Sequence, residues 1–176
     1  MMMRAEHQTR RFRETGFSMI ELLVVVGIIG IVMAAGLPAM QKHTGTAKLK
    51  QATDEVSGSM KLARQRAVAT SGNVVVQFEP DNSRLYLFDD LNGNGVREEG
   101  ETMSGPFDMP KGVDLATVGF ADERVTFGPR GAASESQSVV LRNASANAQT
   151  VSVTAATGLV YVSDIHRFED ADEALQ

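Results

Sequence analysis

Apolar and polar residues divide the chain into segments with different periodicities. After a polar N-terminal stretch, residues 1–16, the segment 17–40 is apolar apart from Ser18, Glu21 and glycines. A helix of these 24 residues would extend about 36 Å, at about 1.5 Å per residue, which suffices to cross a bilayer with some tilt. The pattern therefore predicts a transmembrane helix over residues 17–40.

Residues 41–71 keep the helical spacing but become amphipathic. Apolar side chains recur every three or four positions: Leu49, Ala52, Val56, Met60, Ala63 and Ala67. Charged residues fall mostly off this stripe, as expected for a helix with one buried face. Ser71-Gly72-Asn73 then provides a helix stop. The helix is thus predicted to continue through residues 41–71 as an amphipathic outer half.

Strand-like segments replace the helical spacing from residue 72 onward. Seven segments are predicted strands: Val74–Phe78, Arg84–Phe88, Val113–Ala116, Arg124–Phe127, Gln137–Leu141, Thr150–Thr154 and Leu159–Val162. Gly, Pro, Asn and Ser punctuate the gaps, among them Gly105-Pro106. The predicted fold class is α+β, with a long N-terminal helix whose outer half packs on the antiparallel β-sheet of a head, residues 72–162. The acidic residues 163–176 are predicted to be a flexible tail.

Glu21 is the one charged residue inside the apolar segment. A charge at the centre of a bilayer costs roughly 2.5–3.5 kcal/mol or more, so this glutamate is a functional residue by default. The alternative is that it lies at the membrane interface and snorkels. An ordinary secretory signal, cut near Ala34-Ala35-Gly36, would leave Glu21 unexplained.

The N-terminal stretch is basic next to the apolar segment. It carries four arginines: Arg4, Arg10, Arg11 and Arg13. Basic residues beside an apolar span favour the cytoplasmic side of the membrane. The junction resembles the class III signal of type IV prepilins and pseudopilins, which a dedicated peptidase cuts after a glycine; here it reads Thr15-Gly16-Phe17-Ser18-Met19-Ile20-Glu21-Leu22-Leu23.

Later parts of the chain look like blocks of the GspH/FimT family. These blocks are Leu62–Val68, Gly72–Val76, Val125–Gly131 and Ala156–Val162. Together with the junction they span nearly all of the chain from Gly16 to Val162. The resemblance implies a minor pilin or pseudopilin with a β-rich head on a helical stalk, working in type IV pilus assembly or type II secretion.

The resemblance also implies site residues, partners and a location. Prepilin peptidase would cleave between Gly16 and Phe17, removing residues 1–16 as the leader, and Phe17 would then be N-methylated. Glu21 would pair with the amino terminus of a neighbouring subunit. The chain would cross the bacterial inner membrane once, with its head in the periplasm, and would later enter a pilus or pseudopilus. Its partners would be other pilins or pseudopilins, the peptidase and the inner-membrane assembly platform.

Residues 90–101 match the EF-hand loop pattern position by position. The candidate calcium ligands are the side chains of Asp90, Asn92, Asn94, Glu98 and Glu101 and the backbone carbonyl of Val96. A predicted strand leads into the loop and no exit helix follows, so this would be a calcium loop between strands. Two neutral Asn ligands predict weak binding. The alternative is an Asn-Gly-rich β-turn with acidic residues around it.

Other chemistry is absent from the sequence. There is no cysteine, and the three histidines, His7, His43 and His166, are far apart along the chain. No nucleophile elbow or phosphate loop accompanies them, so the sequence predicts that the protein is not an enzyme. Loss of residues 1–16, which carry an excess of two positive charges, would change the net charge from −5 to −7. That acidic balance argues against a broad nucleic-acid surface.

Two alternative functions follow from the same resemblance. Some FimT-like pilins serve in DNA uptake through a C-terminal stretch with glycine and repeated arginines. The matching place here, Gly158-Leu159-Val160-Tyr161, has no arginine, which leaves Arg124, Arg130 and Arg142 as the candidates for a small basic patch. A DNA-binding minor pilin is therefore one alternative. A major filament subunit, which would differ mainly in abundance, is the other.

Overall fold

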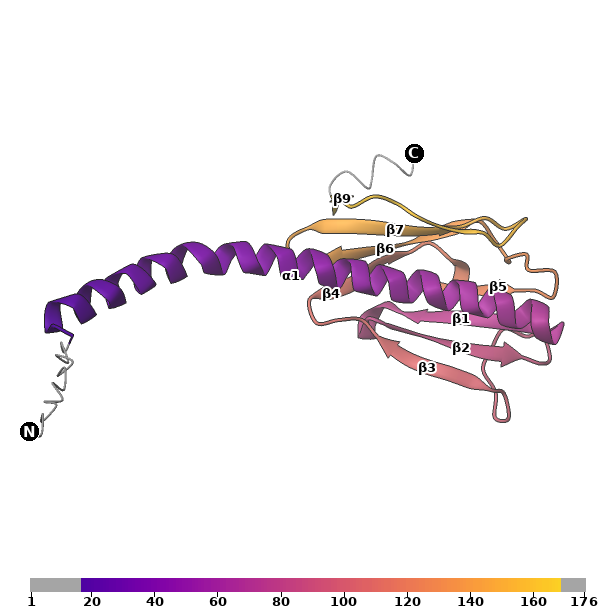
Figure 1. The fold of residues 1–176 in the computed structure, drawn as a ribbon. Coiled ribbons are helices and arrows are strands. Elements are labelled where there is room, and N and C mark those ends of the chain that lie inside the picture. The colour runs from indigo at the N-terminus through magenta and orange to yellow at the C-terminus, as the bar shows by residue number, and fades with distance from the viewer. Residues whose placement is uncertain (1–16, 169–176) are drawn as a thin grey trace, which may run out of the picture. The chain divides into compact units, whose positions relative to one another are not determined.

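The computed structural model describes residues 17–168, without the side chains of residues 34–43. One helix is followed by nine strands and two short 3-10 turns in the described part (Figure 1). The contacts divide the chain between Met40 and Gln41, and the two parts are described separately.

Helix α1 (Met19–Thr70) begins at a side-chain cap. The Oγ of Ser18 accepts a hydrogen bond from the backbone N–H of Glu21, at 3.3 Å. The carbonyl of Ser18 also accepts from the N–H groups of Glu21 and Leu22. Ser18 is thus the N-cap and Glu21 the third helical residue, the arrangement that satisfies backbone donors at a helix start.

The helix ends at the predicted stop. The N–H of Gly72 donates to the carbonyl of Ala67, and that of Ser71 donates to Val68. This pair of bonds defines a Schellman motif. Ser71, with φ +52°, takes the left-handed position that glycine usually occupies there.

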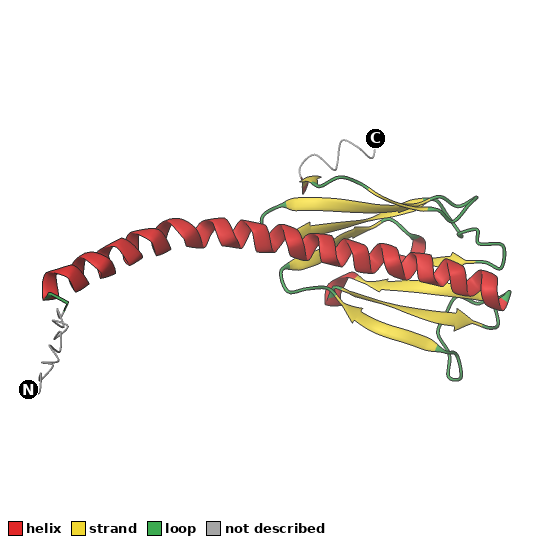
Figure 2. Cartoon of the chain, in the orientation of Figure 1, coloured by secondary structure: helices red, strands yellow, loops and turns green. Residues whose placement is uncertain are grey.

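The strands form two antiparallel sheets (Figure 2). The first has the order β3-β2-β1-β5 and contains β1 (Asn73–Glu79), β2 (Arg84–Asp90), β3 (Met103–Asp108) and β5 (Arg124–Phe127). The second has the order β4-β6-β7-β8, with β9 also paired to β7; it contains β4 (Val113–Val118), β6 (Gln137–Asn143), β7 (Asn147–Val153), β8 (Val160–Val162) and β9 (His166–Arg167). The 3-10 turns are η1 (Pro80–Asn82) and η2 (Ala121–Glu123).

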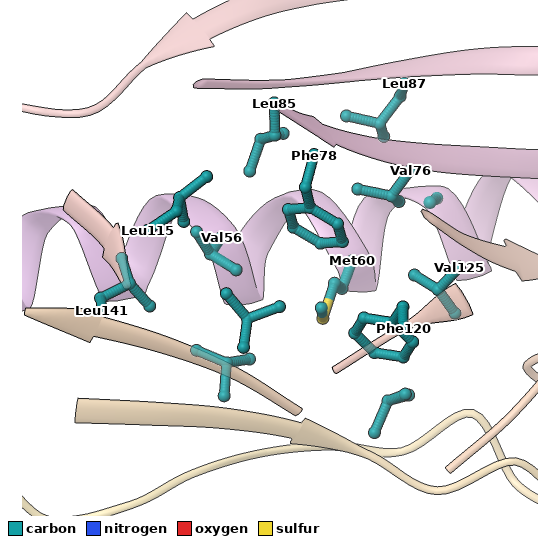
Figure 3. Close-up of a cluster of buried hydrophobic side chains, with 14 of the residues drawn as sticks. Val56, Met60, Val76, Phe78, Leu85, Leu87, Leu115, Phe120, Val125 and Leu141 are labelled. Atoms are coloured by element: carbon teal, nitrogen blue, oxygen red, sulfur yellow. The ribbon is translucent and has the colours of Figure 1, made fainter. Parts of the chain in front are cut away.

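The core lies between α1 and both sheets. The predicted apolar stripe is fully buried: Leu49, Ala52, Val56, Met60, Ala63 and Ala67 are each 0% exposed. It joins one cluster with side chains from both sheets, including Phe78 and Leu141 (Figure 3). Burying a side chain of this kind contributes about 1.5–3 kcal/mol, so this stripe fixes the outer half of α1 on the head. The expected α+β packing is confirmed.

Strand β3 was not predicted, because Gly105-Pro106 read as a gap. The structure places both residues inside β3, which is an edge strand of the first sheet. Proline is tolerated at an edge, where its missing N–H need not pair. The side chains of β3 are mostly exposed, so no apolar alternation marks it in the sequence. The prediction of a gap there was wrong.

The flexible tail was predicted to begin at residue 163, but the residues up to Phe168 include a strand and contacts to the second sheet. Residues His166–Arg167 form β9 and pair with Asn147 and Ala148 of β7. The N–H of Phe168 donates to the carbonyl of Ala146, and the guanidinium carbon of Arg142 lies 4.7 Å from the centroid of the Phe168 ring. A cation–π contact and a strand pairing therefore hold this segment on the second sheet. Residues 169–176 lie outside the described residues.

Candidate assembly site

The described start of α1 is an apolar helix without cover. Every residue from Phe17 to Met33 is exposed, and Phe17, Met19 and Ile31 retain 78%, 85% and 73% of their accessible surface. A helix that is apolar all round is stable only when lipid or other protein covers it. This segment is therefore a surface that needs a partner.

Glu21 carries the only charge on this surface. Its backbone N–H is capped by Ser18, but its carboxylate forms no hydrogen bond or ion pair with any described residue. The partial positive charge of the helix N-terminus contributes only about 0.3–1 kcal/mol to a carboxylate in the first turn. The geometry therefore presents a carboxylate that an external positive group could pair with. Gly16 lies outside the described residues.

Ser18 is a helix cap that the sequence reasoning missed. Ser18-Met19-Ile20-Glu21 has the Ser-x-x-Glu sequence pattern of a capping box, of which the structure shows the serine bond, and this signal could have located the helix start. The cap fixes Glu21 in the first turn of α1, so the serine positions the glutamate.

Membrane crossing is a separate question for this segment. Over the residues whose side chains the structure describes, no helix combines the length and the apolar character needed to span a bilayer. The prediction of a transmembrane helix covered residues 17–40, and the side chains of residues 34–40 are outside the description. It therefore stays a prediction.

The loop between β2 and β3 is organised around Asp90, which is 4% exposed. One carboxylate oxygen of Asp90 accepts from the N–H groups of Gly93 and Asn94, at 2.8 and 3.2 Å. The other accepts from Gly95, at 2.9 Å. The guanidinium of Arg124 in turn donates to the carbonyl of Gly95, at 2.8 Å. This network ties the loop to β5.

The remaining candidate ligands also bond within the loop. The side-chain amides of Asn92 and Asn94 donate to the two carboxylate oxygens of Glu98, at 3.0 and 2.7 Å. The carboxylate of Glu101 accepts from the N–H groups of Leu91 and Glu98. The exposed Val96 donates its N–H to the side-chain oxygen of Asn94.

The predicted calcium ligands belong to one loop that is closed by its own hydrogen bonds. Gly95, the sixth position of the motif, has φ +70°, the left-handed conformation that this turn requires. Among the described residues, however, no three or more His, Cys, Asp or Glu side chains gather so that they could hold a metal ion. A site here would depend on the two Asn side chains and the Val96 carbonyl. Calcium binding stays a prediction.

Arg64 joins three segments that are far apart in the sequence. Its Nε donates to the carbonyls of Gly131 and Thr157, at 3.1 Å each. A Cβ added to Gly158 would collide with the carbonyl oxygen of Gly131. The Arg64 guanidinium is therefore the point where three of the family-like blocks meet: Leu62–Val68, Val125–Gly131 and Ala156–Val162. Periodicity gave no sign of this role, because an arginine on the side of an amphipathic helix looks like a solvated residue.

Comparisons with known proteins agree with this arrangement. Residues 52–158 match the family model described as type II transport protein GspH, and residues 11–37 match the prokaryotic N-terminal methylation motif. The chain belongs to the GspH family. The second match covers the segment that contains Gly16, Phe17 and Glu21.

Curated relatives are fimbrial proteins. Fimbrial protein EcpB of Eikenella corrodens is 37% identical over 87 residues, which are 47% of this chain and 54% of that protein. A fimbrial protein of Pseudomonas aeruginosa is 34% identical over 74 residues, 42% of this chain and 47% of that protein. The chain thus matches about half the length of these relatives.

Solved structures share the fold. The minor pseudopilin EpsH from the type 2 secretion system of Vibrio cholerae superposes with a TM-score of 0.51, at 10% identity, over 66% of this chain and 96% of that chain. The type IV minor pilin FimU of Pseudomonas aeruginosa gives a TM-score of 0.50, at 14% identity, over 69% and 92%. The GspH-family chain therefore has a pilin-like fold. Its family and fold are those of structural proteins, as the sequence predicts, and not those of enzymes.

Proposed function

We propose that this GspH-family chain is a minor pilin or pseudopilin that co-assembles into, or primes, a type IV pilus or a type II secretion pseudopilus. One observation carries the proposal: Glu21, in the first turn of a helix whose described residues through Met33 are all exposed, presents a carboxylate that pairs with no described residue. A carboxylate in hydrocarbon costs roughly 2.5–3.5 kcal/mol or more. Pairing with the positive amino terminus of a neighbouring subunit removes that cost, so assembly satisfies both charges.

Processing precedes assembly in this proposal. Prepilin peptidase cuts after Gly16, where the absence of a side chain lets the backbone enter a narrow site. Phe17 becomes the new amino terminus and is N-methylated, which keeps its positive charge. The match to the N-terminal methylation motif supports this step.

The membrane is the starting point of assembly. Residues 17–40 anchor the chain in the bacterial inner membrane in a single pass, with the leader cytoplasmic and the head periplasmic. The apolar, exposed side chains from Phe17 to Met33 and the four arginines before them support this orientation. The inner-membrane assembly platform then acts on the anchored chain together with other pilins.

DNA capture is the less favoured function. Of the three candidate arginines, Arg124 donates to the carboxylate of Asp122 at 2.8 Å, and Arg142 packs on Phe168. Both are engaged within the head, and an arginine already paired with a carboxylate has less charge to offer a phosphate. The structure adds no observation in favour of DNA binding or of a major-subunit role.

The decisive test replaces Glu21 by Gln in the full chain. The Glu21→Gln variant keeps the shape of the side chain but loses its charge, so we expect normal leader cleavage and loss of incorporation into purified filaments. Glu55→Gln, the same change at an exposed position of the same helix, is the matched control and should incorporate normally. Incorporation of Glu21→Gln at the wild-type level would overturn the proposed role of the carboxylate.

A deletion strain distinguishes the two machines. Loss of surface pili with normal enzyme secretion would identify a type IV pilus component. Retained pili with enzymes trapped in the periplasm would identify a type II secretion pseudopilin. A strain with normal pili and normal secretion would contradict both forms of the proposal.

A further inference from the structure

A small groove lies where α1 passes the turn that leads into β8. Its volume is about 240 Å³, and it is lined by Lys61, Arg64, Gln65, Gly158, Leu159 and Val160. The only ionisable side chains in this lining are two cations. The groove therefore has a positive and an apolar side, and it is far along the chain from Glu21.

The positive charge of the groove is not neutralised within the described part of the chain. Lys61 is exposed and forms no ion pair with any described residue, and Arg64 uses its Nε on two backbone carbonyls, which are neutral. No acidic residue stands three or four positions from either cation on α1, where a helical ion pair would form. A carboxylate from outside would find both cations available.

The apolar side of the groove continues along an open sheet edge. Among the described strands, β8 is the terminal strand of its part of the sheet and pairs only with β7. Leu159 and Tyr161 keep 44% and 56% of their surface exposed.

The backbone at this edge can pair with another strand. Leu159 accepts from Thr154 and Ser163 donates to Thr150, so the odd-numbered residues face β7. By the alternation of an antiparallel ladder, the N–H and C=O groups of Val160 and Val162 point outward.

We propose that this groove and the free edge of β8 bind an extended acidic segment of a neighbouring filament subunit. The segment adds to the edge through the outward backbone groups of Val160 and Val162, as in strand addition. An acidic side chain of that segment lies in the groove between Lys61 and Arg64, and an apolar residue covers Leu159 or Tyr161. The inference rests on the proposed function, since the partner is another subunit of the same filament.

The chemistry of the surface favours a protein over a nucleic acid. Strong phosphate binding needs many cations, whereas this groove offers two beside an apolar edge. Open strand edges recognise polypeptide backbone, and alternate side chains then give specificity.

The test is a photocrosslink in cells. A photoreactive phenylalanine analogue replaces Tyr161 in the full chain, expressed with the pilins of its own system, and the adducts are identified by mass spectrometry. We expect an adduct with an acidic segment of another pilin. Lys61→Glu should lower the yield about tenfold, because a reversed charge repels the carboxylate. Lys50→Glu, an equal charge change at another exposed position of α1, is the control and should leave the yield unchanged.

Charge reversal completes the test. Replacing the crosslinked partner's acidic residue by Lys should restore the adduct of Lys61→Glu. Equal yields for Lys61→Glu and Lys50→Glu would overturn the inference. A nuclease-sensitive adduct would overturn it too, as would an adduct within the same chain to residues 169–176, which would make the chain's own acidic end the occupant. If the wild-type chain is missing from purified filaments, the proposed function fails; if it is present and Lys61→Glu crosslinks normally, only this inference fails.

Discussion

At Gly158 the chain has no room for a side chain. Its φ is +59°, and an added Cβ would collide with the carbonyl oxygen of Gly131 and lie 3.1 Å from the Cδ of Arg64. We expect Gly158→Ala to lower the free energy of unfolding by about 2–3 kcal/mol, through backbone strain and displacement of the Arg64 contacts. Urea unfolding of the purified chain measures this loss.

A substitution at a second glycine separates the cost of backbone strain from the cost of the side-chain collision. Gly112 has φ +86° and open space where a Cβ would lie, so Gly112→Ala carries the backbone cost alone, about 1 kcal/mol. Equal losses in the two variants would show that the meeting of Arg64, Gly131 and Gly158 adds nothing to stability.

Individual site residues were predictable where their chemistry broke a local pattern. Glu21 stands out because a carboxylate interrupts an apolar run, and Asp90 because it opens a recognisable loop motif. Arg64 was not predictable, since its partners are the carbonyls of Gly131 and Thr157, and any residue type has a carbonyl. A hydrogen bond to a backbone carbonyl does not depend on the residue type that carries the carbonyl, so the sequence does not indicate it.

At the scale of elements, the buried stripe of α1 is the main link between helix and sheets. Met60 is 0% exposed and lies among Phe78, Val56 and Phe120 in the core (Figure 3). Met60→Ala should cost about 2–5 kcal/mol, because it removes buried contacts and leaves a cavity. Thermal unfolding of the variant measures this loss of stability. Leu62→Ala on the same helix, at a residue that is 43% exposed, should cost much less; equal costs would contradict the burial of the stripe.

Thermal unfolding can test whether the loop of residues 90–101 binds calcium. Asp90 and Glu101 stand at the first and last motif positions, and Gly95 has the backbone conformation that the turn needs. We expect a higher Tm in about 1 mM calcium than in chelator, with no such rise for Asn94→Ala, which removes one ligand oxygen. The same Tm in calcium and chelator would show that the loop's own hydrogen bonds suffice.

The helix and the strands with a buried face could be predicted from the sequence, while β3 and β9 could not. The stripe from Leu49 to Ala67 and the strand Arg124–Phe127 follow from periodicity, because burial on one face imposes it. The exposed edge strand β3 and the two-residue β9 bury too little to impose any period. They depend on pairing with β2 and β7, a tertiary effect that a local pattern does not contain.

At the scale of the whole molecule, assembly and head stability should be separable. The contacts divide the chain at Met40, with Glu21 on one side and Met60 on the other. Effects of sites without shared contacts add within about 0.3–0.5 kcal/mol. The double variant Glu21→Gln/Met60→Ala should therefore have the unfolding free energy of Met60→Ala alone, and Met60→Ala should still lose its leader at the wild-type rate. Urea unfolding and the mass of the processed chain measure the two quantities. A coupling beyond that margin, or slower cleavage in Met60→Ala, would mean that the head governs how the N-terminal segment is processed or presented.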